Sequence, residues 1–256
     1  MVKRKKNVVY AVSEPGPVRN VNQDAVLAET AYGKDGERIV LLAVCDGMGG
    51  YSQGEIASAF VVARLQKWFR ENLKEIIHEE KSFSKIALEL EEEVLRTDRR
   101  LKQYSAAQKH LLGSTAVIFL QMGDDYVLIN IGDSRAYLYE MGRIEQLTTD
   151  QSLVQKKIEE GLITKSEAAR SNERSVVLQG VGISMQLKPE LTFGKIKKGQ
   201  NILLCTDGFW RKIEARDFLF LFQKNGNSCK TKLKKVTKDL IQRGETDNLS
   251  AVIVTD

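Results

Sequence analysis

The amino-acid sequence predicts an α+β fold in which antiparallel β-sheets carry helices on their outer faces. Short segments rich in β-branched residues follow one another in runs, which is typical of antiparallel sheets. Two long stretches instead repeat their apolar residues at helical spacing. The chain has 256 residues, of which 42% are hydrophobic and 29% charged, and no linker rich in Gly, Ser or Pro divides it. We therefore expect one domain over residues 1–256.

Seven segments are predicted as strands because they are short, β-branched and bounded by Gly, Asp or Asn. In chain order they are Val8–Val12, Ile39–Cys45, Thr115–Leu120, Tyr126–Ile131, Ala136–Tyr139, Ile202–Cys205 and Leu249–Val254. The tripeptide Gly123-Asp124-Asp125 separates two of these strands as a turn, and Met141-Gly142-Arg143 indicates a further hairpin.

Three segments are predicted as helices from their apolar stripes. The first covers about Gln53–Ile77, and Ser52 with Glu55 three residues later has the pattern of a capping box at its start. The second covers about Phe83–Gln108, and a third covers Thr231–Arg243.

No apolar run approaches the ~20 residues that a membrane-spanning helix needs, so no membrane partner is expected. The basic segment Met1–Lys6 is not followed by a long apolar stretch, which argues against a secretory signal. The three cysteines are odd in number, and Cys45 and Cys205 lie within strand-like runs, as buried thiols of a reducing compartment do. We expect a cytoplasmic protein.

The formal net charge is +5 with a pI near 9.0, and basic residues gather in Lys3–Lys6 and Lys224–Lys238. This pattern suits either attraction to acidic or phosphorylated partners or simply a solvated surface, and the second interpretation is preferred. Neither segment has the interleaved aromatic residues of a nucleic-acid platform, so no nucleic acid is expected as a partner.

Five aspartates end or adjoin apolar strands, and this placement is the main indication of function. They are Asp24, Asp46, Asp133, Asp207 and Asp247. A single Asp-Gly or Asp-Asn pair is usually just a turn. Five such positions beside buried strands weaken that explanation, because a buried carboxylate is costly unless it is paired or bound to a metal. Zinc-type Cys/His spacing is absent, and a carboxylate-rich oxygen site suits Mg²⁺ or Mn²⁺.

The segment Asp46-Gly47-Met48-Gly49-Gly50 has three glycines in four residues, which lets the backbone approach a ligand closely. It lacks the Gly-Lys-Ser/Thr ending of a P-loop, so a turn that offers backbone oxygen to a metal is the better interpretation. Arg19 precedes Asp24 by five residues, and a guanidinium beside two metals would grip phosphoryl oxygens. Histidines His78 and His110 lie in polar sequence and are expected at the surface.

Taken together, six ordered motifs resemble the PPM, or type 2C, family of metal-dependent protein phosphatases, in its bacterial form. They are Arg19-x-x-Asn22-Gln23-Asp24, Val44–Gly50 with Gly54-Glu55 and Ala57-Ser58, Gly113–Ala116, Asn130–Arg135, Leu203–Gly208 and Thr246–Leu249. The resemblance covers nearly the whole chain. It implies a four-layer sandwich of two antiparallel β-sheets flanked by pairs of antiparallel helices, with a flap segment at about 153–175.

The resemblance also implies a role for each site residue and two divalent cations, Mn²⁺ or Mg²⁺, as cofactors. Asp46 would bridge the two metals, and the backbone carbonyl of Gly47 would join one of them. Asp24, Asp207 and Asp247 would complete the metal shell. Asp133 would hold a third, weaker metal, and Arg19 would bind the phosphate.

The activity implied is hydrolysis of phosphoserine and phosphothreonine on proteins by a metal-bridging hydroxide, opposing a serine/threonine protein kinase. The expected partners are phosphorylated proteins, including such a kinase, and the chain is expected to be a monomer. Two departures flank the flap. Asp150-Gln151-Ser152 stands where the family usually has Asp-His-Ser, and Ser171-Asn172-Glu173 stands where it tends to have a His-Pro pair.

Two other functions remain open from the sequence. One is a catalytically weak regulatory module of the same fold that binds phosphoproteins, which the altered flap motifs would permit. The other is a phosphatase for small phosphate esters or nucleotides, although no base-stacking or ribose motif supports it.

Overall fold

Two antiparallel sheets form the centre of the computed structural model, which describes residues 8–34, 36–49, 53–78, 81–223 and 228–255. The first sheet has the order β1 (Val8–Glu14), β11 (Leu249–Thr255), β10 (Asn201–Cys205), β7 (Arg135–Glu140) and β8 (Arg143–Gln146). The second has the order β2 (Asp24–Tyr32), β3 (Arg38–Gly49), β5 (Ala116–Met122), β6 (Asp125–Ile131) and β9 (Glu190–Lys195), and β4 (Leu112–Ser114) pairs with the end of β3.

Strand β3 shows how the sequence builds both sides of the second sheet. Successive side chains of a strand point to opposite faces. Val40, Leu42 and Val44 therefore pack against the first sheet, together with Ile202 and Val252. The alternate residues of β3 instead face the helices on the outer side; they are Leu41, Ala43 and Cys45. Because both faces are buried, the strand is a continuous apolar run instead of an alternating one.

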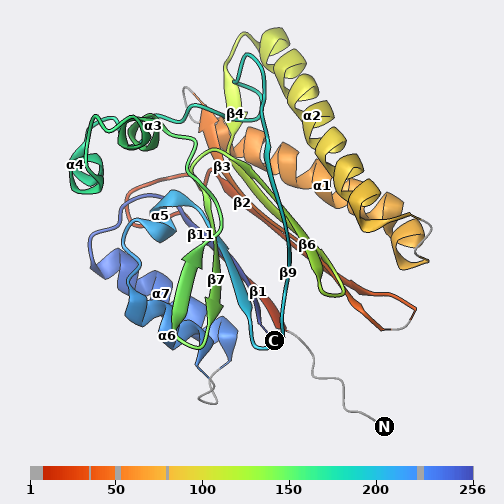
Figure 1. The fold of residues 1–256 in the computed structure, drawn as a ribbon. Helices are drawn as coiled ribbons and strands as arrows, with labels where there is room; N and C mark the ends of the chain where they lie inside the picture. Colours follow the sequence, from red (N-terminus) through yellow and green to blue (C-terminus); the bar gives the residue numbers. More distant parts are fainter. Residues whose placement is uncertain (1–7, 35, 50–52, 79–80, 224–227, 256) are drawn as a thin grey trace.

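The helices cover the outer faces of the two sheets, as Figure 1 shows. α1 (Gly54–Ile77) and α2 (Phe83–Gln108) pack on the second sheet, and α6 (Ala215–Phe222) and α7 (Cys229–Gln242) pack on the first. The predicted four-layer α+β sandwich is confirmed. No helix in the described ranges is long and apolar enough to cross a membrane.

The predicted helices are present with small shifts at their ends. α1 begins at Gly54, and its N-cap residue Gln53 makes no side-chain capping bond. The capping residue expected there, Ser52, lies outside the described residues, as do Lys3–Lys6, Gly50 and Lys224. α7 begins two residues before the expected Thr231, because the side chain of Ser228 accepts a hydrogen bond from the Thr231 backbone amide.

The seven predicted strands correspond to β1, β3, β5, β6, β7, β10 and β11, whereas β2, β4, β8 and β9 were not predicted as strands. β2 lies at the edge of its sheet and is mostly half-buried or exposed, so it has no continuous apolar pattern. β9 is interrupted by Gly194, which pairs with Tyr126 on β6. A Cβ at Gly194 would lie 2.5 Å from the Tyr126 ring, so glycine makes room for the aromatic side chain there.

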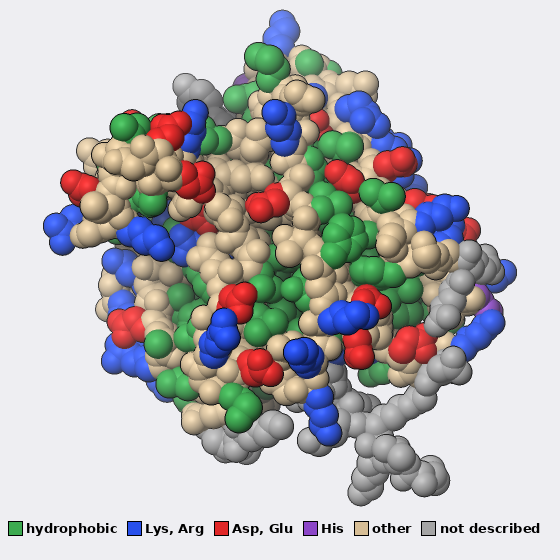
Figure 2. Space-filling view, viewed as in Figure 1, with side chains coloured by type: hydrophobic (Ala, Val, Ile, Leu, Met, Phe, Trp, Pro, Cys, Tyr) green, Lys and Arg blue, Asp and Glu red, His purple; other side chains and the backbone are tan. Residues whose placement is uncertain are grey.

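The segment predicted as a flap contains two short helices, α3 (Leu153–Glu159) and α4 (Lys165–Arg170), which lie to one side of the sandwich in Figure 1. α3 buries none of its residues. A β-bridge between Ser152 and Val177 holds the two ends of the segment next to each other. Figure 2 shows lysine and arginine interspersed with aspartate and glutamate over the visible face, without a large area of one sign.

Candidate functional site

The ends of strands from both sheets bring the five predicted aspartates together. Asp24 and Asp46 face each other directly as cross-strand partners on β2 and β3. Burial raises the pKa of Asp46 well above its usual value, and the charges of Asp207, Asp24, Asp133 and Asp247 raise it further. Like charges on facing strands repel. Asp46 therefore belongs to a carboxylate cluster whose charged form would be stabilised by bound cations.

The Asp24 carboxylate is buried and held by a hydroxyl from the opposite sheet. The Thr206 hydroxyl, at the end of β10, donates to Asp24 Oδ2 over 2.8 Å. Burial raises the pKa of Asp24 to about 7, while hydrogen bonds from Ser250 and Thr206 lower it and the charges of Asp207 and Asp247 raise it. The two sheets are thus fixed to each other at this carboxylate.

The backbone around Asp46 is locked to the segment that follows β4. The Asp46 amide donates to Thr115 Oγ1 over 2.9 Å, and the Thr115 amide donates to the Asp46 carbonyl over 2.9 Å. The Ser114 hydroxyl donates to the same carbonyl over 3.1 Å. A carboxylate on such a fixed backbone is pre-positioned for a ligand.

Gly47 passes so close to the start of α1 that no side chain fits on either partner. A Cβ at Gly47 would lie 2.0 Å from the Gly54 carbonyl oxygen, and a Cβ at Gly54 would lie 2.4 Å from the Gly47 carbonyl oxygen. The Gly47 amide donates to the Gln23 carbonyl over 3.0 Å, and the Ser58 hydroxyl donates to that same carbonyl over 2.6 Å. These contacts keep the first and second motifs side by side.

Arg211 supplies positive charge to the cluster, a role that sequence reasoning missed. Its guanidinium forms an ion pair with Asp207, one helical turn earlier, and lies 3.5 Å from Asp247 Oδ2. It also lowers the pKa of Asp133, although burial and the charges of Asp207 and Asp150 raise that pKa to about 8. The sequence signal was the four-residue spacing from Asp207, which places the two side chains together on a helix.

Arg19 lies on a loop that Asn248 organises. The Asn248 side chain donates to the carbonyls of Pro15, over 2.9 Å, and Val21, over 3.2 Å, and accepts from the Gln23 amide over 2.9 Å. Arg19 Nε lies 3.0 Å from Asp247 Oδ1, and its side chain is 53% exposed. The guanidinium is therefore anchored at the cluster while part of it remains accessible to a ligand.

The Asp133 loop is held by Gln151, one of the two departures from the family pattern. The side-chain oxygen Oε1 of Gln151 accepts a hydrogen bond from the Gly132 backbone amide over 2.9 Å. The backbone amide of Gln151 donates to the Gly132 carbonyl over 2.8 Å. Trp210 Nε1 donates to the Asp133 carbonyl over 2.8 Å. Gln151 thus has a positioning role here, and it joins the start of the flap segment to the site.

A cavity of about 810 Å³ lies beside the cluster, between the flap segment and α5 (Asp207–Trp210). Arg135, Arg174 and Arg211 are among its lining residues, together with Asp150 and Asp247. Arg135 makes a bidentate pair with Asp150, at 2.8 and 2.7 Å, and its guanidinium carbon lies 3.4 Å from the centre of the Trp210 ring. An anionic ligand would meet several arginines in this cavity.

The donor set fits hard divalent cations. Oxygen ligands of this kind are those that Mg²⁺ and Mn²⁺ prefer. In the described ranges no three acidic, histidine or cysteine side chains converge closely enough to coordinate one ion as they stand. Asp207 and Asp247 are instead turned to Arg211 and Arg19. Burial and mutual repulsion raise the pKa of Asp24, Asp46 and Asp133, so bound cations would stabilise the charged forms of these carboxyls. His78 and His110 are exposed, as expected.

Without metal, the protein is expected to lose stability as the pH rises. Asp24 and Asp133 have pKa values of about 7 and 8 in the folded chain, against about 3.9 for a free aspartate. The folded state therefore binds more protons than the unfolded state between about pH 4 and pH 8, so stability falls across that interval. We expect a higher melting temperature in chelator at about pH 5 than at about pH 8.

The matched variant for this pH prediction is Asp133→Asn, which removes one of the carboxyls whose pKa is raised and should shrink the difference between the two melting temperatures. Added Mn²⁺ should raise the melting temperature most at the higher pH, where the ligands are deprotonated. A metal-free protein that is more stable at about pH 8, with no change in the variant, would contradict this prediction.

Comparisons with known proteins agree with one another. The family model for protein phosphatase 2C matches residues 18–253. Serine/threonine phosphatase stp of Listeria welshimeri is 27% identical, over 94% of this chain and 93% of its own length. Serine/threonine protein phosphatase PstP of Mycobacterium tuberculosis is 32% identical over 77% of this chain, which spans only 35% of that longer relative.

A solved structure gives the same result for the fold. The crystal structure of the catalytic domain of PstP in complex with two manganese ions has a TM-score of 0.80 and 25% identity. The alignment covers 97% of each of the two chains.

Proposed function

Since the chain belongs to the protein phosphatase 2C family, we propose that it hydrolyses phosphoserine and phosphothreonine on proteins. The observation that supports this most is the cluster of five aspartates beside Arg19 and the arginine-lined cavity. The chain is a metal-dependent protein serine/threonine phosphatase, and Mn²⁺ or Mg²⁺ is its cofactor. When bound, such cations neutralise phosphoryl charge and activate water for attack.

The aspartates have different positions, which support different roles. We assign Asp46 to both cations because its carboxyl feels the charges of all four other aspartates. Asp24, Asp207 and Asp247 would complete the shell, and the Gly47 carbonyl, at the close approach to α1, would add a backbone oxygen. Asp133 would hold a third cation only weakly, because the Arg211 guanidinium already supplies positive charge beside it.

Arg19 is assigned to the phosphoryl group. It is anchored by Asp247 at 3.0 Å but keeps half of its side chain exposed. Guanidinium groups bind phosphoryl oxygens through paired hydrogen bonds in a fixed plane. Arg19 would therefore orient the phosphoester beside the carboxylate cluster, and the cavity below the flap segment would receive the surrounding peptide.

The cellular setting follows from the proposed activity. The partners are phosphorylated proteins, and we include among them substrates of a serine/threonine protein kinase that this phosphatase opposes. The free thiols of Cys45 and Cys205 are buried, which supports a reducing, cytoplasmic location. We propose that the chain acts as a monomer.

The regulatory-module alternative rests on the altered flap motifs. Gln151 does not open or distort the site, because its side chain and backbone hold Gly132 next to Asp133. All five aspartates are gathered, which favours an active enzyme over a binding module.

A comparison of substrates tests the proposed function. The purified protein with Mn²⁺ should release phosphate from a phosphothreonine peptide much faster than from nucleoside monophosphates, since the cavity beside the cluster has room for the peptide around the phosphorylated residue. Faster release from the nucleotides would instead support the small-ester phosphatase. Release from neither substrate, by a protein that binds Mn²⁺, would support the binding module.

A further inference from the structure

Three lysines of α7 lie on one face of the helix. Lys230, Lys234 and Lys238 recur every four residues, so their side chains lie one above the other along the helix. All three are exposed, and none of them forms an ion pair or hydrogen bond with a residue that the structure describes. We call these three residues the lysine row.

The other two lysines of the same stretch are engaged. Lys235 lies 2.9 Å from Asp239 Oδ2 and stands 5.8 Å from the centre of the Phe220 ring. Lys232 is buried, and its ammonium donates to the Gln223 carbonyl. The lysine row therefore differs from its neighbours in keeping its charge available to a ligand.

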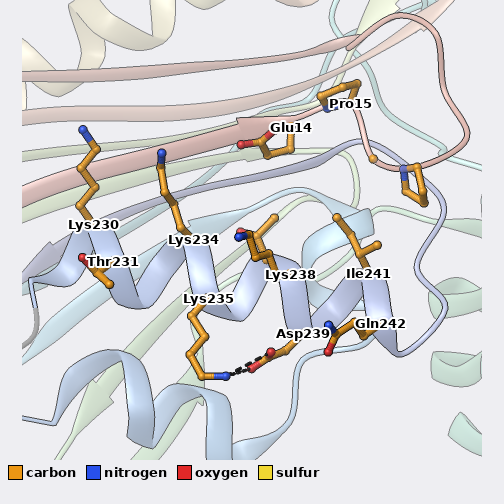
Figure 3. A pocket seen from close by; sticks show the side chains of 13 residues that line it. Glu14, Pro15, Lys230, Thr231, Lys234, Lys235, Lys238, Asp239, Ile241 and Gln242 are labelled. Carbon is orange, nitrogen blue, oxygen red and sulfur yellow. Dashed lines mark hydrogen bonds and ion pairs between the residues drawn. The ribbon is translucent and has the colours of Figure 1, made fainter.

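The lysine row forms one wall of a groove. The cavity has a volume of about 900 Å³ and is lined on the other side by Glu14, Pro15, Gly16 and Pro17, at the end of β1. Figure 3 shows Lys230 and Lys234 extending from α7 toward this strand. The acidic residues that line the groove are Glu14 and Asp239, and Asp239 is already paired with Lys235. The groove is therefore positively charged.

The loop that lines one side of the groove also contacts the candidate active site. Gly16 has a φ of +74°, and a Cβ there would lie 2.2 Å from the Asp247 carbonyl oxygen, so the loop touches the backbone of a proposed metal ligand. Asn248 donates to the Pro15 carbonyl over 2.9 Å. The same loop continues to Arg19. After α7 the chain continues into the segment that contains Asp247. Lys238 is therefore closer along the chain to Asp247 than Lys230 and Lys234 are.

We propose that this groove binds an acidic, extended segment of the protein substrate adjacent to its phosphorylated residue. The proposal rests on the proposed phosphatase function and names a substrate class for it. Four residues of a helix rise about 6 Å, so the ammonium-bearing positions repeat at that interval. Alternate residues of an extended peptide are about 6.6 Å apart and point the same way. A segment with Asp or Glu at every second position therefore matches the lysine row in spacing and charge.

The measured effect should be on substrate affinity and not on chemistry. The triple variant Lys230→Gln, Lys234→Gln and Lys238→Gln removes three charges and keeps good helix formers in place. We expect its KM for an acidic phosphothreonine peptide to rise about tenfold, which corresponds to three exposed ion pairs of ordinary strength. Its kcat, and its turnover of para-nitrophenyl phosphate, should not change. The effect should diminish at high salt because exposed charges are screened.

A matched control variant separates the groove from net charge. Lys34, Lys197 and Lys198 are exposed lysines that do not line the groove. The triple Lys→Gln variant at these positions makes the same charge change and should leave the KM for the acidic peptide unchanged. A control peptide with Asn and Gln in place of Asp and Glu should not distinguish the variants.

Direct binding makes the proposal testable without turnover. A fluorescent acidic peptide without phosphate should bind the wild-type and control proteins in an anisotropy titration, and should bind the lysine-row variant about tenfold more weakly. Peptide binding that is lost only in the lysine-row variant would support the groove even if the phosphatase assay failed. Equal binding and equal KM in both variants would overturn the proposal. A DNA oligonucleotide that competes as well as the peptide would overturn it too, by showing a general polyanion surface.

Discussion

Asp46→Asn is expected to lower turnover of a phosphothreonine peptide by roughly 10³-fold, because a cation at a phosphoryl centre contributes several kcal/mol of transition-state stabilisation. Asparagine keeps the size of the side chain but removes the carboxylate charge. Asp46 feels Asp207, Asp24, Asp133 and Asp247, so its loss should weaken both cation sites at once. Phosphate release at saturating Mn²⁺, together with Mn²⁺ binding by calorimetry, measures the two effects.

The control for this experiment is Asp124→Asn, an exposed aspartate in the turn between β5 and β6. It should retain wild-type turnover and Mn²⁺ binding. The folded state should survive Asp46→Asn, because removing a buried charge that its neighbours repel does not weaken the metal-free protein. A variant with turnover within threefold of wild type would exclude Asp46 from the reaction.

Arg19→Ala is expected to reduce kcat/KM for the same peptide by roughly 100-fold, since charge-assisted bidentate hydrogen bonds to phosphoryl oxygens would be lost. Mn²⁺ affinity should not fall, because the Arg19 guanidinium is paired with the Asp247 carboxylate. Removing the guanidinium leaves that carboxylate free to bind a metal. Arg19→Lys should restore only part of the loss, because a point charge does not reproduce the planar fork.

Metal binding distinguishes the two possible roles of Arg19. If Arg19→Ala lowered Mn²⁺ affinity together with turnover, the arginine would be a support for Asp247 and not a phosphate ligand. An unchanged kcat/KM in Arg19→Ala would show that Arg19 takes no part in binding the phosphoryl group.

The sequence predicted the parts of the fold whose pattern is local. β3, β5 and β10 are buried on both faces, so their apolar runs are continuous and easy to identify. β2 and β9 are edge strands with both polar and apolar residues, so neither can be identified as a strand until its partner strand is known. In β9 the glycine that interrupts the pattern is required by Tyr126 on the neighbouring strand, which no local pattern indicates.

Local pattern also explains how much of the site could be predicted. Each aspartate could be found because it lies in or next to an apolar strand, and the structure gathers all five. Arg211 was missed, although its four-residue spacing from Asp207 could have indicated their ion pair. The role of Asn248 could not be assigned in advance, because it depends on how the Pro15–Gln23 loop meets β11 in space. Gln151 was a departure from a familiar motif in the sequence, whereas in the structure it holds Gly132 through two hydrogen bonds.

Phosphate release from a phosphothreonine peptide, measured as Mn²⁺ is titrated into chelator-treated protein, tests the central claim most directly. Wild-type protein should show no release in chelator and saturable release as Mn²⁺ is added, and Asp46→Asn should stay roughly 10³-fold slower at every Mn²⁺ concentration. Release that persists in chelator, or that Mn²⁺ restores fully in Asp46→Asn, would contradict a metal-dependent phosphatase site built on these aspartates.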